Sequence, residues 1–211
     1  MNDTLVIIPT YNEKENVAPI AMAVLAECPQ ADLLFVDDNS PDGTGALGDQ
    51  LAASNPRINI LHREKKQGLG RADLAGFRWA LERPQYQFIM EMDADFSHDP
   101  RDLGSLLAAA QSADVVLGSR YVRGGGVTDW GLVRRAVSRG GGIYARVILG
   151  VPVNDLTGGF KCFRRAVLEK IDLSAIRSRG YGFQIELTYK ALLAGFTVKE
   201  VPIVFRDRTL G

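Results

Sequence analysis

The stretch LLFVDDNSPDGTGALGDQLAAS, Leu33–Ser54, contains a strand, a turn and a helix in succession. The continuous apolar run over Leu33–Asp37 is typical of a strand that is covered on both faces. Asn39–Gly43 is rich in turn-forming residues, and Thr44–Ser54 has the pattern of a helix. A buried strand followed by a helix is the unit of a mostly parallel α/β sheet, so this stretch predicts that fold.

The same alternation of strands and helices extends over the first half of the chain. Four further apolar runs predict strands in the middle of a sheet, and apolar residues spaced three or four apart predict helices. The further predicted strands are Leu5–Pro9, Ile58–His62, Phe88–Met92 and Val115–Gly118, and the further predicted helices are a segment beginning near Asn16, Ala72–Arg83, Arg101–Ser112 and Leu132–Leu149.

The second half of the chain changes character. Gly158–Arg164 predicts a short strand, Gln184–Leu193 a helix and Thr197–Phe205 a final strand. We expect these elements to form a small C-terminal appendage to the sheet. A chain of 211 residues with 46% hydrophobic content is long enough for one sizeable core and short for two full domains, so we expect one α/β unit over residues 1–211.

Composition argues against several classes of protein. Lys and Arg number 25, as do Asp and Glu, so net charge gives no reason to expect a nucleic-acid partner. Cys28 and Cys162 are too few for a disulfide framework and lack zinc-ligand spacing. No stretch reaches the roughly 18 uninterrupted apolar residues that a spanning helix needs, and the N-terminus lacks a signal segment. We therefore expect a chain that is soluble or peripheral to a membrane.

Polar clusters follow three of the predicted strands. They are Pro9–Glu13, Asp37–Gly43 and Asp93–Asp95. Because ligands of open α/β sheets bind beyond the carboxyl ends of the strands, we expect these clusters to meet at one edge. Asp37 and Asp38 fit turn chemistry in part, but two adjacent acids at a strand end also predict that one of them faces the crevice.

The tripeptide Asp93-Ala94-Asp95 places two carboxylates on one side of an extended segment. This arrangement suits Mg²⁺ or Mn²⁺, which completes its coordination with water and substrate phosphates. Two solvated acids after a strand are the alternative. The position beside two other acidic turns favours the metal.

Two common nucleotide-binding motifs are missing from the sequence. No GxGxxG follows the first strand and no GxxxxGK[ST] occurs. Gly68-Leu69-Gly70 follows the third strand instead, after Lys65 and Lys66. This basic turn could hold a phosphate at a helix N-terminus, and a solvated charge run explains it equally well.

Eight motifs, in order along almost the whole chain, resemble family 2 glycosyltransferases. Among these, the greatest resemblance is to dolichol-phosphate or polyprenol-phosphate mannosyltransferases. The motifs are PTYNE (Pro9–Glu13), VDDNSPDGT (Val36–Thr44), KKQGLGRA (Lys65–Ala72), MDADFSHDP (Met92–Pro100), GSRY (Gly118–Tyr121), TGGFK (Thr157–Lys161), GYGFQIE (Gly180–Glu186) and EVPIVFRDR (Glu200–Arg208).

The resemblance implies a GT-A-type, Rossmann-like catalytic domain with a nucleotide-sugar half, about residues 1–120, and an acceptor half, about residues 121–211. It implies GDP-mannose as donor and Mg²⁺ or Mn²⁺ as cofactor. Asp93 and Asp95 would hold the metal, with Asp95 and Arg120 as the catalytic residues. The implied nucleotide-sugar contacts are Pro9, Tyr11, Glu13, Val36, Asp38, Asp93, Ala94, Asp95, Arg120 and Arg208.

The acceptor implied by the resemblance is a polyprenyl (dolichyl) monophosphate, bound by Arg120, Arg134 and Ser138. Arg134 and Ser138 lie one turn apart on the predicted helix Leu132–Leu149, which carries arginines and large apolar side chains. Such a helix can lie in a membrane interface, and plain packing in the core is the alternative. We expect a peripheral enzyme at the cytoplasmic face of a membrane, anchored there by a separate segment or subunit.

A lipid monophosphate is already a nucleophile at neutral pH, because the second pKa of a phosphate is about 6. The enzyme then needs no strong general base, so we expect an inverting single displacement. In the family a Gly-x-Ser-Lys segment normally follows the position of Arg208, whereas this sequence stops at Gly211.

Three alternatives stay open at this stage. A polyprenyl-phosphate glucosyl- or other hexosyltransferase that uses a UDP-sugar would have the same parts. A catalytically inactive nucleotide-sugar binding module would be expected to lack some acidic or acceptor-side residues. A nucleotidyltransferase would typically have a glycine- and arginine-rich loop where this chain has Pro9–Glu13.

Overall fold

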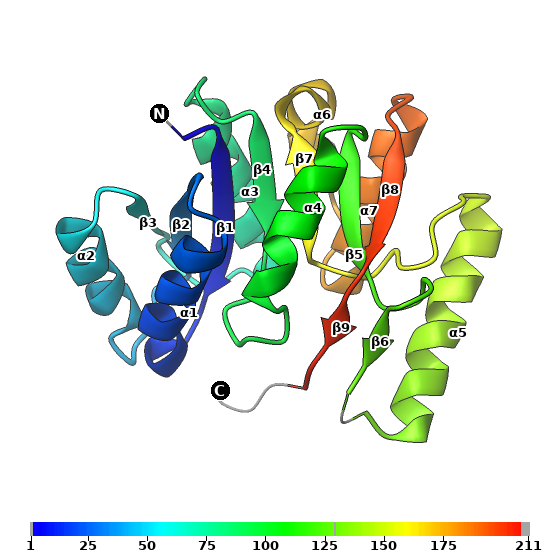
Figure 1. The fold of residues 1–211 in the computed structure, drawn as a ribbon, viewed down its shortest axis with the longest axis horizontal. Helices are drawn as coiled ribbons and strands as arrows, with labels where there is room; N and C mark the ends of the chain where they lie inside the picture. The colour runs from blue at the N-terminus through cyan, green and yellow to red at the C-terminus, as the bar shows by residue number, and fades with distance from the viewer. Residues whose placement is uncertain (1, 129, 208–211) are drawn as a thin grey trace.

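A seven-stranded, mostly parallel sheet with helices on both faces forms the body of the molecule in this computed structural model, which describes residues 2–128 and 130–207 (Figure 1). The strand order is β3-β2-β1-β4-β7-β5-β8, and β6 and β9 form a separate pair. The strands are β1 (Thr4–Thr10), β2 (Ala31–Asp37), β3 (Ile58–His62), β4 (Phe88–Glu91), β5 (Val115–Ser119), β6 (Gly126–Val127), β7 (Lys161–Arg164), β8 (Val198–Pro202) and β9 (Val204–Phe205).

The helices fill the connections between these strands. They are α1 (Lys14–Glu27), α2 (Thr44–Ser54), α3 (Leu69–Leu81), α4 (Leu103–Ala110), α5 (Leu132–Leu149), α6 (Arg165–Lys170) and α7 (Tyr181–Leu193), with the 3-10 helices η1 (Pro100–Asp102) and η2 (Leu173–Ala175). The five strands predicted for the first half are confirmed, and the bounds of β3, α2 and α5 are those predicted. The predicted position in the middle of the sheet is wrong for β3, which forms an edge and is only partly buried.

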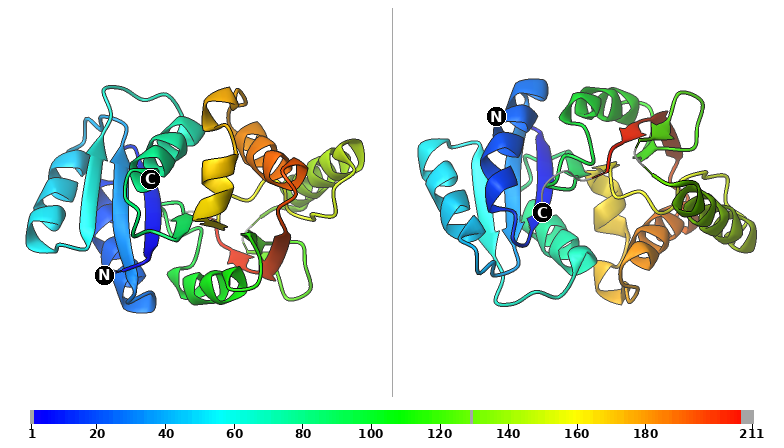
Figure 2. Two further views of the ribbon diagram at one scale, coloured as in Figure 1. Left: turned by 90° about the horizontal axis from the view of Figure 1, so that it is seen from above. Right: turned by 90° about the horizontal axis from the view of Figure 1, so that it is seen from below.

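Helices cover both faces of the sheet (Figure 2), and their apolar side chains form two layers against it. Side chains of α1, α2 and α4 pack on one face, and those of α3, α6 and α7 pack on the other. Strands β1 and β2 are almost entirely buried, as their continuous apolar runs predict. Their parallel register sets Pro9 beside Val36 and Thr10 beside Asp37, so both strands end at the same edge.

The prediction of a C-terminal appendage is wrong for β7. This strand lies inside the sheet, antiparallel to both β4 and β5. Cys162 and Phe163 are fully buried, and the ring of Phe163 meets that of Phe77 of α3 edge-on at 5.6 Å. A short apolar strand late in the sequence can therefore occupy the middle of a sheet, because order along the chain does not set order in space. Strand β8 adds to the edge, parallel to β5.

Several element boundaries also differ from the predictions. Helix α1 begins at Lys14, so Pro19 lies inside it rather than in its first turn. Helix α3 begins at Leu69, after Gly68 at a φ of 94° that favours glycine. The predicted helix Arg101–Ser112 is divided between η1 and α4, and the predicted strand Thr197–Phe205 between β8 and β9. The pair β6–β9 and helix α6 were not predicted.

Helix α5 stands at one end of the molecule, beside β6 and away from α2 (Figures 1 and 2). Ala145 and Leu149 pack against the core from this helix. Its other large apolar side chains with described exposure are 53% to 78% exposed, and they are Val133, Val137, Ile143, Tyr144, Val147 and Ile148. Packing of this apolar face in the protein core is therefore excluded.

Candidate active site

Two cavities open side by side at the carboxyl ends of the strands. The first is lined by Pro9–Tyr11, Glu13, Asp38, Lys66 and neighbouring residues. The second is lined by His98, Arg120, Trp130, Arg134 and Gln184 among others. Leu69, Asp93 and Asp95 belong to the walls of both. The two acids of the tripeptide thus stand on the boundary between the cavities.

The first cavity gathers most of the residues predicted to bind the nucleotide sugar. Its walls contain Pro9, Tyr11, Glu13, Asp38, Asp93, Ala94 and Asp95. The ammonium of Lys66 lies 3.7 Å from the centre of the Tyr11 ring, so the basic turn before α3 contributes to this site as well. The sequence left open whether that turn was functional or merely solvated.

Val36 differs from the other predicted nucleotide contacts. Its side chain is fully buried in the apolar core of the face covered by α3, beside Pro9 in the neighbouring strand. Val36 is not among the described residues that line the first cavity, so only its backbone could contact a nucleotide there. Its predicted role stays a prediction.

The adjacent acids Asp37 and Asp38 have different surroundings. Asp37 accepts hydrogen bonds from the hydroxyl of Ser40 at 2.6 Å and from that of Thr10 at 3.2 Å. Its carboxylate therefore stabilises the turn. Asp38 lines the first cavity, pairs with Arg63 and accepts the backbone N–H of Gln67 at 3.1 Å. Asp38 is the member of the pair that faces the crevice.

The loop after β4, which carries the two acids, has an uncommon backbone conformation at Phe96. Asp95 Oδ1 accepts the backbone N–H of Ser97 at 3.0 Å, and Phe96 between them has a φ of 60°. A bulky residue rarely adopts a positive φ, and such strain is concentrated at functional sites. The side chain of Ser97 is also buried, and its hydroxyl has no hydrogen-bond partner among the described residues.

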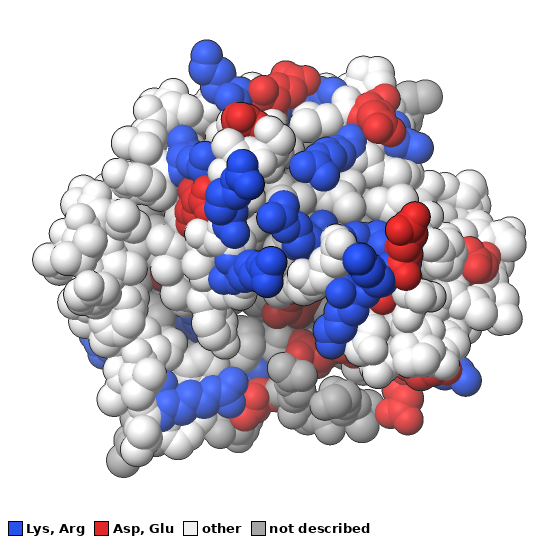
Figure 3. Space-filling model, turned by 180° about the vertical axis from the view of Figure 1, so that it is seen from behind, with Lys and Arg blue, Asp and Glu red and all other residues white. Residues whose placement is uncertain are grey.

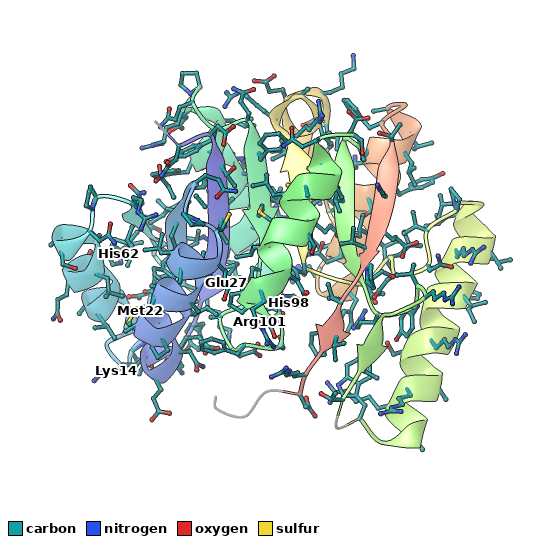
Figure 4. All side chains as sticks on the ribbon, viewed as in Figure 1. Lys14, Met22, Glu27, His62, His98 and Arg101 are labelled. Carbon is teal, nitrogen blue, oxygen red and sulfur yellow. The ribbon has the colours of Figure 1, made fainter. Side chains whose placement is uncertain are left out.

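His98 supports this loop from inside the protein. Its Nδ1 accepts the backbone N–H of Asp93 at 3.1 Å, and its ring stacks on Phe160 with centres 4.9 Å apart. Burial lowers the pKa of His98, in keeping with a neutral ring whose Nδ1 accepts. His62 lies apart at the end of β3, 2.9 Å from Asp49 of α2 (Figure 4).

The donor set at the boundary of the cavities fits a hard divalent cation. Asp93 is 31% exposed at its side chain and lies in both cavity walls with Asp95. Within residues 2–128 and 130–207, no three acidic, histidine or cysteine side chains are grouped as a metal cage. Mg²⁺ is usually bound by one or two carboxylates together with substrate phosphates, so two carboxylates facing a ligand cavity suffice.

Arg120 lines the second cavity but is committed to an acid that sequence analysis missed. Its Nε and Nη2 donate to the two carboxylate oxygens of Asp155 at 2.7 and 2.6 Å, and Nη2 also donates to the hydroxyl of Thr157 at 2.8 Å. Arg120 is 8% exposed and Asp155 is 1% exposed. The ion pair therefore fixes the side chain of Arg120 in the cavity wall. An arginine on the open surface would not be held in this way.

The predicted acceptor residues Arg134 and Ser138 differ in their position relative to the second cavity. Arg134 lines the second cavity, stacks over Trp130 at 4.2 Å and pairs with Asp207 at 2.8 Å. Ser138 is not among the described residues that line this cavity, and its hydroxyl lies 2.7 Å from that of Tyr121. Arg208 lies outside the described residues.

Charged side chains are unevenly distributed around the cavities. Figure 3 shows Lys and Arg gathered across the middle of one face, above a hollow in which acidic side chains are visible. The walls of the two cavities contain Lys66, Arg120 and Arg134 as well as Asp93 and Asp95. Basic groups beside an acidic pair suit a ligand that carries both phosphate groups and a divalent cation. None of the described helices has the length and apolar character needed to cross a bilayer.

Comparison with known proteins finds similar sequences over most of the chain. Residues 5–172 match the family Glycosyl transferase family 2. A polyprenol monophosphomannose synthase of Mycolicibacterium smegmatis is 54% identical over 99% of this chain and 79% of its own length. An undecaprenyl-phosphate mannosyltransferase of Micrococcus luteus is 48% identical over 98% of this chain and 85% of its own length.

A solved structure has the same fold at low sequence identity. The mannosyltransferase PcManGT of Pyrobaculum calidifontis, in complex with GDP-Man and Mn²⁺, superposes with a TM-score of 0.65 at 17% identity. The likeness covers 99% of this chain and 57% of that one. The predicted GT-A-type α/β fold is confirmed.

Proposed function

Because the chain belongs to glycosyl transferase family 2, we propose that it transfers mannose from GDP-mannose to a polyprenyl monophosphate and forms polyprenyl phosphate mannose. Mannosyl transfer to such a lipid is the activity named for the two relatives that match almost the whole chain. GDP-Man and Mn²⁺ are bound in the mannosyltransferase structure of the same fold, which supports GDP-mannose as the donor here.

The observation that carries the proposal is the pair of cavities that share Asp93 and Asp95. A nucleoside in the first cavity, between Tyr11 and Asp38, would direct its diphosphate towards the shared acids. The mannose would then extend into the second cavity, where the acceptor enters. One boundary thus brings the departing diphosphate and the attacking phosphate together.

Different residues would serve the donor, the acceptor and the metal in the reaction. Asp93 and Asp95 would hold Mg²⁺ or Mn²⁺, which neutralises the departing diphosphate when bound. Arg134 would attract the acceptor phosphate, and Arg120, held by Asp155, would present a fixed positive charge between the two phosphates. The acceptor oxygen attacks the anomeric carbon from the side opposite the diphosphate, which inverts that carbon.

Helix α5 supports attachment to the membrane that contains the acceptor. Residues 133, 137, 144 and 148 are spaced along one stripe of the helix, and all four side chains are at least 66% exposed. Arg134 and Arg135 flank this stripe near its start. An apolar stripe with flanking arginines suits the boundary between lipid headgroups and acyl chains. The second cavity, which Arg134 lines, would then open beside the lipid surface.

The two buried free cysteines, Cys28 and Cys162, agree with a reducing compartment, so we place the enzyme at the cytoplasmic face of its membrane. The separate anchoring segment or subunit expected from the sequence stays a prediction. So does the division of the chain into a donor half and an acceptor half.

The experiment is a transfer assay with a choice of donors. The protein is incubated with radiolabelled GDP-mannose or UDP-glucose, a short polyprenyl phosphate and Mg²⁺ or Mn²⁺, and the lipid is extracted. We expect label in the organic phase from GDP-mannose. Label from UDP-glucose alone would replace mannosyl by glucosyl transfer, and label from neither donor would favour a binding module.

A further inference from the structure

A buried polar cluster lies beneath the second cavity, in a part of the protein that the proposed reaction does not use. Its members come from four elements, namely Asp73 of α3, Glu91 of β4, Lys161 of β7 and Gln184 of α7. Each is at most 4% exposed. Burying a lysine costs free energy unless its ammonium is paired and hydrogen-bonded, so this cluster calls for an explanation.

Lys161 is the centre of the cluster. Its Nζ lies 3.5 Å from Oε1 of Glu91 and donates a hydrogen bond to the backbone carbonyl of Gln184 at 3.2 Å. The same Nζ also donates to the side-chain oxygen Oε1 of Gln184. Burial opposes the charge of Lys161 and lowers its pKa, whereas nearby Glu91 and Asp73 raise it. Burial also raises the pKa of Asp73 and of Glu91, whereas Lys161 and the side chain of Gln184 lower that of Glu91.

The contact with Lys161 decides which way the Gln184 amide faces. An ammonium has three donors and no acceptor, so it can bond to the amide oxygen and would repel the amide NH₂. With Oε1 directed at Lys161, Nε2 lies on the other branch of the amide. Gln184 lines the second cavity together with Gly158 and Gly159.

The amide NH₂ of Gln184 lies close to Gly159. A Cβ at this position would stand 3.4 Å from Nε2 of Gln184 and 3.9 Å from Cε1 of His98. Nε2 is therefore beside the bare backbone of the Gly158–Gly159 wall. The wall of the second cavity thus combines a neutral donor with the cations of Arg120 and Arg134.

We propose that Lys161 is a positioning residue for the acceptor site, because it orients Gln184 so that the amide NH₂ donates a hydrogen bond to the acceptor phosphate. This inference rests on the proposed function. The acceptor is favoured over the nucleoside because Gln184 belongs to the wall of the second cavity, with Arg134 and Trp130, whereas Tyr11, Asp38 and Lys66 form that of the first.

The test is a double-mutant cycle in the transfer assay. Lys161→Met, Gln184→Met and the double variant are compared for the KM of polyprenyl phosphate and the KM of GDP-mannose. Loss of a hydrogen bond to a charged group should raise the acceptor KM about tenfold in each single variant, with the donor KM unchanged. The double variant should lose no more than Gln184→Met alone, because Lys161 acts through Gln184.

Two further variants test whether a rise in the acceptor KM only reflects damage to the fold. Lys161→Met/Glu91→Gln removes the acid that the first substitution leaves unpaired, and should show the same rise in acceptor KM. Gln184→Glu keeps an oxygen for Lys161 but lacks the NH₂ donors, so the acceptor KM should rise here too. Lys199→Met, on the exposed side of β8, is the matched control and should leave both KM values unchanged.

The outcomes separate this inference from the proposed function. If the unmodified protein transfers mannose but the effects of Lys161→Met and Gln184→Met on the acceptor KM multiply, Lys161 acts independently and the inference is wrong. An unchanged acceptor KM in folded Gln184→Glu would also overturn it. If the unmodified protein labels no polyprenyl phosphate, the proposed function fails and this inference fails with it.

Discussion

Arg120 and Asp155 are 35 residues apart in the chain, and they form two side-chain hydrogen bonds inside the protein, of 2.7 and 2.6 Å. Asp155 Oδ2 also accepts the backbone N–H of Arg120 at 2.9 Å. The backbone of Asp155 is itself held by Glu200, whose Oε1 accepts its N–H at 2.9 Å. This connection ties the end of β5 to the segment before β7 and to β8.

Breaking this pair should cost stability as well as activity. Asp155→Asn leaves a buried arginine without its counter-charge, a change that typically costs about 3 kcal/mol. The free energy of unfolding, measured by urea titration, should fall by about this amount. Arg120→Met/Asp155→Leu should regain most of the loss in stability while transfer stays impaired. If the stability loss of Arg120→Met/Asp155→Leu equals the sum of the losses of Arg120→Met and Asp155→Leu, the two residues are not coupled as described.

The apolar stripe of α5 should decide binding to lipid and leave the chemistry unaffected. Val137→Asp/Tyr144→Asp places two charges in the stripe, so sedimentation with anionic phospholipid vesicles should weaken about tenfold or more. Transfer to a short, water-dispersed polyprenyl phosphate should continue at the original rate. Met22→Asp is the control, since Met22 is 73% exposed on α1 (Figure 4). Equal loss of vesicle binding in the control would argue against α5 as the contact.

The close approach of α3 to β1 should be sensitive to a single added side chain. A Cβ at Gly76 would come within 2.6 Å of Cγ2 of Ile7. Gly76→Val should therefore destabilise the protein by about 1–3 kcal/mol through overpacking, as measured by thermal or urea unfolding. Gly104→Ala in α4, where a Cβ meets nothing within 4 Å, should be neutral or slightly stabilising. Equal stability of the two variants would contradict this packing.

The sequence predicted the first half of the fold well because most strands there, β1, β2 and β5 above all, are buried and have continuous apolar runs. It failed for β7, because a four-residue strand carries no signal for its neighbours in the sheet. Lys161 illustrates the difficulty, since a lysine within a strand suggests an exposed edge and this one is fully buried beside Glu91. Pairing of that kind depends on the tertiary structure and not on local pattern.

Site residues could be predicted where a motif sets them at the end of a strand, as for Asp38, Asp93 and Asp95. The burial of the Val36 side chain could not be predicted, because a motif does not distinguish a residue that lines a cavity from one beneath it. Asp155 was missed because its partner Arg120 lies 35 residues away along the chain, and Trp130 because it belongs to none of the motifs. A carboxylate two residues before Thr157-Gly158-Gly159 was the available signal for Asp155.

The central claim is that the two acids on the boundary of the cavities bind the donor through a divalent cation. Titration calorimetry of GDP-mannose, with and without Mn²⁺, tests it most directly in the unmodified protein and in Asp95→Asn, with Glu82→Gln of the exposed surface as control. We predict that Mn²⁺ strengthens donor binding at least about tenfold in the unmodified protein and the control, and has little effect in Asp95→Asn. An equal effect of Mn²⁺ in Asp95→Asn would contradict the claim.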